Sequence, residues 1–178
     1  MTEKARIATL WLDGCSGCHM SLLDIDERML DIAPLIDLVY SPVVDAKEFP
    51  GNVDLTLVEG AIASDEDIEK MKLVRSRTKL LVALGDCAVT GNVPALRNNF
   101  LLEDVLQRGY VDNATANPGT PNHEVPKLEA KVIPLHELVH VDLFVPGCPP
   151  SADLIFFVLS EVLAGRVPDL STQCRFGN

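Results

Sequence analysis

This 178-residue sequence has few basic residues, no apolar run long enough to span a membrane and only five cysteines. Only 15 Lys and Arg oppose 26 Asp and Glu, and the net charge of −11 argues against nucleic acid or an anionic membrane as a partner. The apolar segment 7–12 near the N-terminus is too short for a secretory signal or a membrane span, and no twin-arginine motif is present. A cytoplasmic location is therefore expected.

The sequence does contain enough apolar residues, 47% of the chain, to build the core of a single domain over 1–178. Short apolar runs alternate with segments of helical periodicity, which is typical of an α/β fold with a parallel sheet. We expect a sheet of about four to five strands flanked by helices. Strands are predicted at residues 7–12, 35–40, 53–58, 80–84 and 141–145.

Helices are predicted at residues 21–33, 64–77 and 151–163, with weaker pieces at 93–98 and 101–107. Ser64 and Asp67 form a capping-box pattern at the start of the second helix. Residues 111–131 are rich in proline and show little periodicity, so a long loop that faces a partner is expected there. The last residues, 168–178, are expected to form an extended tail.

Four of the five cysteines follow predicted strands: Cys15 and Cys18 the first, Cys87 the fourth and Cys148 the fifth. Because parallel strands end at one edge of a sheet, these side chains are expected to converge there. A glycine stands one or two residues before each cysteine and lets the backbone approach a bulky group. The cysteines are also odd in number and too few for a disulfide scaffold, so they indicate a metal site.

Three kinds of site could use these cysteines. Zinc and iron–sulfur clusters both accept four thiolates. A zinc ribbon usually has two close pairs of cysteines, whereas this chain has one close pair followed by two distant single cysteines. That spacing favours a cube-shaped [4Fe-4S] cluster over zinc. A non-redox, zinc-stabilised interaction module stays open as an alternative. A thioredoxin-like use of Cys15 and Cys18 is the third alternative, and it leaves Cys87 and Cys148 without a role.

Several other residues near these loops have more than one interpretation. Glu59 ends the third strand at the same edge, where its carboxylate either relays protons or accepts hydrogen bonds from loop amides. His19, next to Cys18, either forms a hydrogen bond near the site or lies at the surface as a cap. Trp11 is expected in the core or an interface, and Cys174 is expected to be a free thiol in the tail.

His136, Glu137 and His140 match the H-E-x-x-H pattern of zinc metalloproteases. Pro134 precedes the pattern and a predicted strand follows at residue 141, which leaves room for about one helical turn. A loop that carries two histidines is therefore the better interpretation.

Four blocks of the sequence resemble [NiFe] hydrogenase small subunits. They are residues 11–24 (WLDGCSGCHMSLLD), 58–62 (VEGAI), 84–88 (LGDCA) and 145–150 (VPGCPP), in the order found in that family. The resemblance spans nearly the whole chain and is greatest to the small subunit of soluble, bidirectional NAD-reducing hydrogenases. The related quinone-reductase subunit of respiratory complex I is the alternative, but it has adjacent cysteines where this chain has Cys15 and Cys18.

The resemblance implies a flavodoxin-like domain in which Cys15, Cys18, Cys87 and Cys148 hold the iron of one proximal [4Fe-4S] cluster. The chain would be the electron-transfer subunit of an enzyme that catalyses H2 + NAD+ = NADH + H+, without a complete active site of its own. A Ni–Fe centre is expected on a large subunit, and further iron–sulfur clusters, FMN and NAD on diaphorase-type subunits. The topology leaves room for a flavin on this chain, although no residue demands one.

Overall fold

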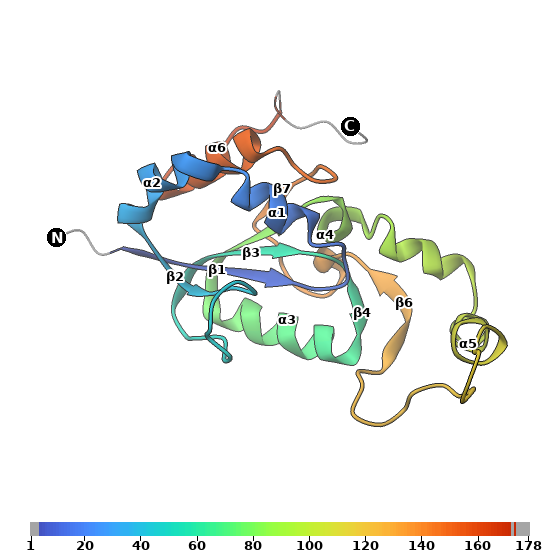
Figure 1. Ribbon diagram of the computed structural model, residues 1–178. Helices are drawn as coiled ribbons and strands as arrows, with labels where there is room; N and C mark the ends of the chain where they lie inside the picture. The colour runs from blue at the N-terminus through green and yellow to red at the C-terminus, as the bar shows by residue number, and fades with distance from the viewer. Residues whose placement is uncertain (1–3, 172, 174–178) are drawn as a thin grey trace.

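A five-stranded parallel sheet forms the centre of the computed structural model, which describes residues 4–171 and residue 173 (Figure 1). In spatial order the strands are β2 (Ile36–Tyr40), β1 (Ala5–Trp11), β3 (Val53–Glu59), β5 (Thr78–Leu84) and β7 (Leu143–Val145). This is the flavodoxin-like strand order, whose topological switch point lies between β1 and β3. The predicted fold class and all five predicted strands are confirmed.

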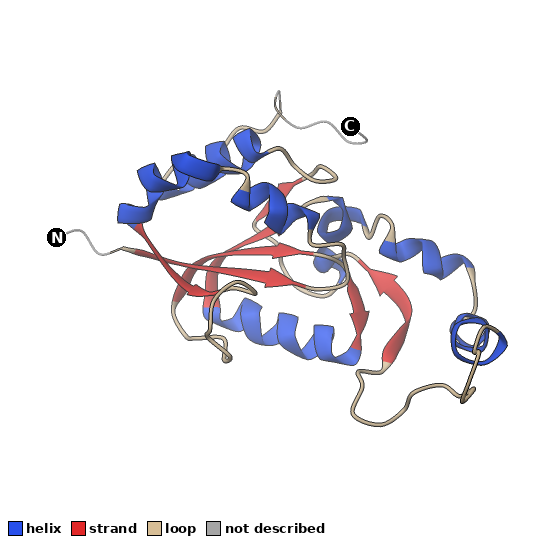
Figure 2. Ribbon diagram, in the orientation of Figure 1, coloured by secondary structure: helices blue, strands red, loops and turns tan. Residues whose placement is uncertain are grey.

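Helices cover both faces of the sheet (Figure 2). Met71 of α3 (Asp65–Arg77) is buried against one face, and Ile155 of α6 (Ala152–Leu163) is buried against the other. The central strands β3 and β5 are therefore covered on both sides, which explains why nearly all of β3 and the last four residues of β5 are buried. Burial of one Leu or Val side chain contributes about 1.5–3 kcal/mol, so the buried Leu and Val side chains of these two strands stabilise the core substantially.

The predicted capping box sets the start of α3. Ser64 Oγ accepts a hydrogen bond from the Asp67 backbone N–H at 3.2 Å, and Asp67 Oδ2 accepts one from the Ser64 N–H at 3.0 Å. These bonds satisfy amides that have no partner within the helix. At the other end Arg75 donates a hydrogen bond to Asp142 at 2.5 Å, which ties α3 to the segment before β7.

The segment predicted as one helix over 21–33 is divided into shorter pieces, so that prediction is wrong. The pieces are α1 (Gly17–Leu23), the 3-10 turn η1 (Asp26–Arg28), α2 (Met29–Ile32) and the 3-10 turn η2 (Ala33–Leu35). Asp26 has a φ of 56°, which a continuous right-handed helix does not contain. Since α1 begins at Gly17, Cys18 lies in its first turn.

The chain between β5 and β7 forms a smaller part beside the sheet (Figure 1). This stretch of chain begins with α4 (Asp86–Thr90), which packs against the sheet, and the part beside the sheet contains the 3-10 segment η3 (Pro94–Asn99), α5 (Leu102–Gln107) and the π-helical turn η4 (Arg108–Asp112). The weak helical pieces predicted here are confirmed in place, although the first is a 3-10 segment.

A two-stranded antiparallel sheet formed by β4 (Ile62–Ser64) and β6 (Leu128–Ile133) was not predicted. The loop predicted over 111–131 is therefore shorter at both ends, because η4 continues to Asp112 and β6 begins at Leu128. The two strands lie far apart in the sequence, and a local pattern does not reveal such a pairing. The side chain of Asn98 also bonds to both backbone groups of Val132, at 2.8 Å each.

The C-terminal segment begins as predicted, with Ser151 Oγ accepting a hydrogen bond from Leu154 N–H at the start of α6. Gly165, with a φ of 72°, follows the end of this helix. The described residues of the predicted tail contain no helix or strand, and Cys174 lies outside the described residues. Among the helices of residues 4–171 and 173, none is long and apolar enough to cross a membrane.

Candidate metal centre

The four cysteines that follow strands line one pocket at the carboxyl edge of the sheet. Cys15 follows β1, Cys18 lies in the first turn of α1, Cys87 lies on α4 after β5, and Cys148 follows β7. Glu59, the last residue of β3, lines the same pocket. We call this the cysteine pocket, and its other lining residues are Gly14, Gly17, Gly60, Asp86, Gly147 and Pro149. The predicted convergence of the cysteines is confirmed.

The thiols of the pocket differ in burial and therefore in acidity. Cys15 and Cys148 are exposed, whereas Cys18 and Cys87 are half-buried, and all four are free. Burial raises the pKa of Cys18, and the Glu59 carboxylate raises it further. Burial, followed by the neighbouring Cys148, raises the pKa of Cys87 to about 11. A cation or cluster would remove this penalty by compensating the thiolate charges, so the donor set fits a metal group.

Two alternatives from the sequence can be compared with this geometry. A thioredoxin-like thiol at a helix start has a lowered pKa, whereas the pKa of Cys18 is raised and its pocket also contains Cys87 and Cys148. The other alternative is a zinc ion, which needs ligands that meet at one point. Within the described part of the chain, no three His, Cys, Asp or Glu side chains are placed to hold one ion. The four thiols instead surround a space, an arrangement that favours a cluster over a single zinc ion.

Glycines bring the backbone into contact with two of the sulfurs. A Cβ atom built on Gly85 would lie 2.2 Å from Cys18 Sγ, and one built on Gly17 would lie 3.2 Å from Cys15 Sγ. Gly85 also has a φ of 84°, in the region that favours glycine. A side chain at Gly85 would therefore occupy the position of a pocket thiol.

Hydrogen bonds between loops hold the cysteine-bearing segments together. The Asp86 N–H donates to the Gly147 carbonyl at 2.9 Å, and the Gly147 N–H donates to Asp86 Oδ1 at 2.7 Å. Asp13 and Ala61 likewise exchange backbone bonds of 2.7 and 3.1 Å between the loops after β1 and β3. The relative positions of the four cysteines thus depend on contacts between segments far apart in the chain.

A chain of polar side chains runs from the pocket into the core. Glu59 is 2% exposed, and its Oε2 accepts a hydrogen bond from the His19 backbone N–H at 2.6 Å and lies 2.9 Å from His19 Nδ1. His19 Nε2 is 2.9 Å from Thr9 Oγ1, which bonds to Ser41 Oγ at 2.7 Å. The acceptor role predicted for Glu59 is confirmed. The surface alternative for His19 is wrong, because this residue is buried.

Sequence reasoning did not identify Thr9 or Ser41 in this chain of contacts. Thr9 lies within an apolar strand and Ser41 directly follows β2, and neither belongs to a recognisable motif. Burial of both hydroxyls, with Ser41 at 4% exposure, becomes evident only in three dimensions.

Two further predicted features lie outside the cysteine pocket. The 3-10 turn η5 (Leu135–Glu137) contains the first half of the H-E-x-x-H match, and His140 lies outside any helix, so the loop interpretation is confirmed. Trp11 is 47% exposed and is not part of the core. Its indole Nε1–H donates to the Gly14 carbonyl at 3.1 Å and so supports the loop that carries Cys15.

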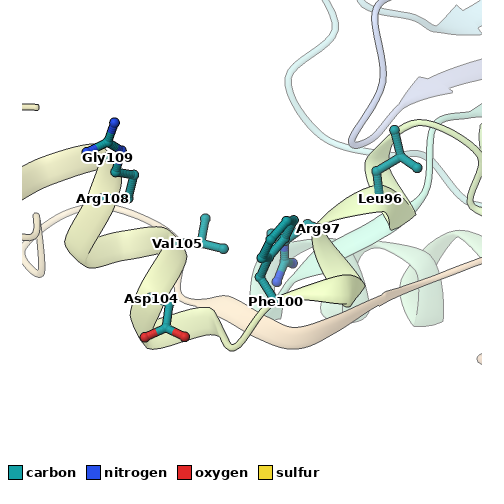
Figure 3. A pocket seen from close by; sticks show the side chains of 7 residues that line it. All are labelled: Leu96, Arg97, Phe100, Asp104, Val105, Arg108 and Gly109. Carbon is teal, nitrogen blue, oxygen red and sulfur yellow. The ribbon is translucent and has the colours of Figure 1, made fainter.

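A separate hollow lies between η3 and the segment formed by α5 and η4 (Figure 3). Apolar side chains account for much of its lining, and no cysteine contributes to it. The residues shown are Leu96, Arg97, Phe100, Asp104, Val105, Arg108 and Gly109. This hollow has none of the ligand chemistry of the cysteine pocket.

Comparison with known proteins shows similarity over most of the chain. Residues 15–162 match the family described as NADH ubiquinone oxidoreductase, 20 kDa subunit. The delta subunit of the NAD-reducing hydrogenase HoxS from Cupriavidus necator is 44% identical over 175 residues, covering 96% of this chain and 84% of the relative. One subunit of the F420-non-reducing hydrogenase vhu from Methanocaldococcus jannaschii is 37% identical, covering 97% of this chain but 61% of the longer relative.

The fold is also similar to that of a solved hydrogenase. One chain of an NAD+-reducing [NiFe]-hydrogenase, determined in the H2-reduced state, superposes with a TM-score of 0.93 and 39% sequence identity. The match covers 98% of this chain and 99% of the other, so the similarity includes the sheet, the helices on both faces and the smaller part beside the sheet.

Proposed function

We propose that this chain holds one [4Fe-4S] cluster in its cysteine pocket. The chain belongs to the family of the 20 kDa subunit of NADH ubiquinone oxidoreductase, and it is the small subunit of an NAD-reducing [NiFe] hydrogenase. The observation that carries the proposal is the convergence of four thiols from three separate loops on one space. Cys15, Cys18, Cys87 and Cys148 would each ligate one iron.

The chemistry of the pocket supports this assignment. Thiolates are the usual protein ligands of iron–sulfur clusters. Gly85 and Gly17 have no side chain that would collide with the sulfurs of Cys18 and Cys15. When bound, the cluster would supply one-electron transfer between the reaction centre and the next carrier. Hydrogen bonds between Asp86 and Gly147 would hold the loops that carry Cys87 and Cys148 together, and the protein would surround the buried thiols.

In the whole enzyme the chain would connect two partners during the reaction H2 + NAD+ = NADH + H+. A large subunit would contribute the Ni–Fe centre, and diaphorase-type subunits would contribute further iron–sulfur clusters, FMN and the NAD site. The exposed residues of loop 113–127, which connects η4 to β6 at the lower right of Figure 1, would face a partner. We propose a cytoplasmic complex without nucleic acid or membrane among its partners, as the excess of acidic residues suggests.

The complex I-like alternative has less support. The matching family includes the quinone-reductase subunit, but 44% identity to a NAD-reducing hydrogenase subunit favours the hydrogenase branch. The spacing of Cys15 and Cys18 favours the same branch.

The test is native purification without oxygen, followed by metal, sulfide and subunit analysis. We expect about four irons and about four labile sulfides per chain, together with an electron paramagnetic resonance signal that appears when the cluster is reduced by one electron. A Ni–Fe subunit and diaphorase subunits should be recovered in the same complex. Stoichiometric zinc without iron would overturn the cluster, and quinone-reductase subunits in place of a Ni–Fe subunit would overturn the hydrogenase context.

The proton-relay role of Glu59 remains a prediction. In Glu59→Gln, Oε1 of the amide still accepts the His19 N–H bond, but the side chain no longer carries a transferable carboxyl proton. We expect turnover to fall about tenfold or more, with iron content unchanged. Glu137→Gln, at an exposed position on η5, is the control and should retain full turnover. Equal turnover in the two variants would leave Glu59 with only its structural contact to His19.

A further inference from the structure

Among the described residues, one side-chain hydrogen bond reaches a sulfur atom of the cysteine pocket. Asn92 Nδ2 lies 3.5 Å from Cys148 Sγ, and the two residues come from different loops. None of the sequence motifs includes Asn92. The contact therefore needs an explanation beyond the four ligands themselves.

The local backbone directs the Asn92 side chain toward this sulfur. Helix α4, which carries Cys87, is followed by Gly91, whose N–H donates a hydrogen bond to the Cys87 carbonyl at 2.9 Å. Gly91 has a φ of 84° and Asn92 a φ of 34°, so two successive residues adopt positive φ values. Glycine and asparagine tolerate this region better than most residues do. The turn that ends α4 thus brings an amide donor to the loop after β7.

Both ends of α4 contact the segment that carries Cys148. At the start of the helix, Asp86 exchanges two hydrogen bonds with Gly147, and after its end Asn92 contacts the Cys148 sulfur itself. The first pair of bonds fixes the backbone before Cys148. The Asn92 contact is not needed to hold the backbone before Cys148 in place. Its effect is therefore expected on the Cys148 sulfur itself.

We propose that Asn92 tunes the reduction potential of the cluster by donating a hydrogen bond to the Cys148 sulfur, an inference that rests on the proposed cluster. One-electron reduction increases the negative charge shared by the ligand sulfurs. A donated N–H stabilises that charge more in the reduced form than in the oxidised form, and hydrogen bonds to sulfur are an established determinant of cluster potential. Asn92 therefore makes the cluster easier to reduce. It acts through Cys148 and is a positioning residue.

The test compares Asn92→Asp and Asn92→Gly in the assembled enzyme. Aspartate and glycine both tolerate positive φ, so neither change forces the turn to rearrange. Asn92→Asp replaces the donor by a carboxylate of nearly equal size, and Asn92→Gly only removes the donor. The control is Asn99→Asp, which places the same charge at an exposed asparagine that bonds to the Leu96 carbonyl.

The readouts are iron per chain and the midpoint potential of the cluster in an equilibrium redox titration. With iron content retained, we expect Asn92→Asp to lower the ratio of reduced to oxidised cluster at a fixed potential about tenfold, a shift of the midpoint potential of about 59 mV to more negative values for one electron. Asn92→Gly should shift the potential in the same direction by a smaller amount, and Asn99→Asp should leave it unchanged.

An unchanged potential in Asn92→Asp and Asn92→Gly, with full iron content, would overturn the role of Asn92 and leave the cluster assignment intact. If Asn92→Asp loses iron, the potential of Asn92→Gly decides the question in the same way. A parent enzyme without iron would instead overturn the proposed function, so the two failures are distinguishable.

Discussion

Cys87→Ser and Cys148→Ser are each expected to leave the purified chain with less than about one iron in place of about four. A serine hydroxyl is a far weaker ligand for iron than a thiolate, and each of these two loops contributes a single cysteine to the pocket. Neither loop has a second thiol that could take over the vacant position. Hydrogen-dependent NAD+ reduction should fall to background in both variants, because the electron path through this chain would be lost.

The matched control is Cys174→Ser, which changes the cysteine that follows no predicted strand. Iron and labile sulfide should remain at about the parental level in this variant. The measurement is chemical iron and sulfide analysis per chain, with circular dichroism to show that each variant is folded. Equal iron loss in Cys174→Ser, or full iron in Cys87→Ser, would show that the ligand assignment is wrong.

Gly85→Ala is expected to reduce the iron content to less than about half, although it changes no ligand. The new Cβ would lie 2.2 Å from Cys18 Sγ, closer than the two atoms can approach, so the sulfur must move. The φ of 84° adds backbone strain of about 1–2 kcal/mol for a residue with a Cβ. The first effect displaces the Cys18 sulfur and the second strains the backbone of residue 85, so both should also lower the unfolding midpoint.

Two further variants separate sulfur crowding from backbone strain. Gly17→Ala brings a Cβ to 3.2 Å from Cys15 Sγ at a residue without positive φ, so it crowds a sulfur without that strain and should cause a smaller loss of iron. Gly109→Ala, where an added Cβ meets no atom within 4 Å, should change neither iron content nor stability. Full iron content in Gly85→Ala would contradict the close approach of the backbone to Cys18.

The broad plan of the site was predictable because it depends on features that act locally or through sheet topology. Apolar runs define the strands, and the carboxyl ends of parallel strands meet at one edge. Residues as distant as Cys18 and Cys148 could therefore be placed together without coordinates. The start of α3 was predictable for a similar reason, since Ser64 and Asp67 are separated by only three positions and cap the helix by themselves.

The errors in prediction came from features that depend on distant parts of the chain or on one unusual backbone angle. The pattern of residues 21–33 is helical, but Asp26 adopts a positive φ and interrupts the helix. Strand β6 lacks a strong strand pattern and forms by pairing with β4 and with the Asn98 side chain. Long-range pairing of this kind has no local signature.

Sequence alone determined the chemistry of this protein: four thiols, their separation along the chain and the sheet edge at which they meet. Only the tertiary structure decided how those thiols are surrounded, including the backbone contact at Gly85, the buried Glu59–His19 pair and the Asn92 contact to Cys148. The physical reason is the separation along the chain of the residues that determine each feature. Apolar periodicity and strand order follow from neighbouring residues, whereas burial and hydrogen bonds between loops arise when the whole sheet brings separate segments together.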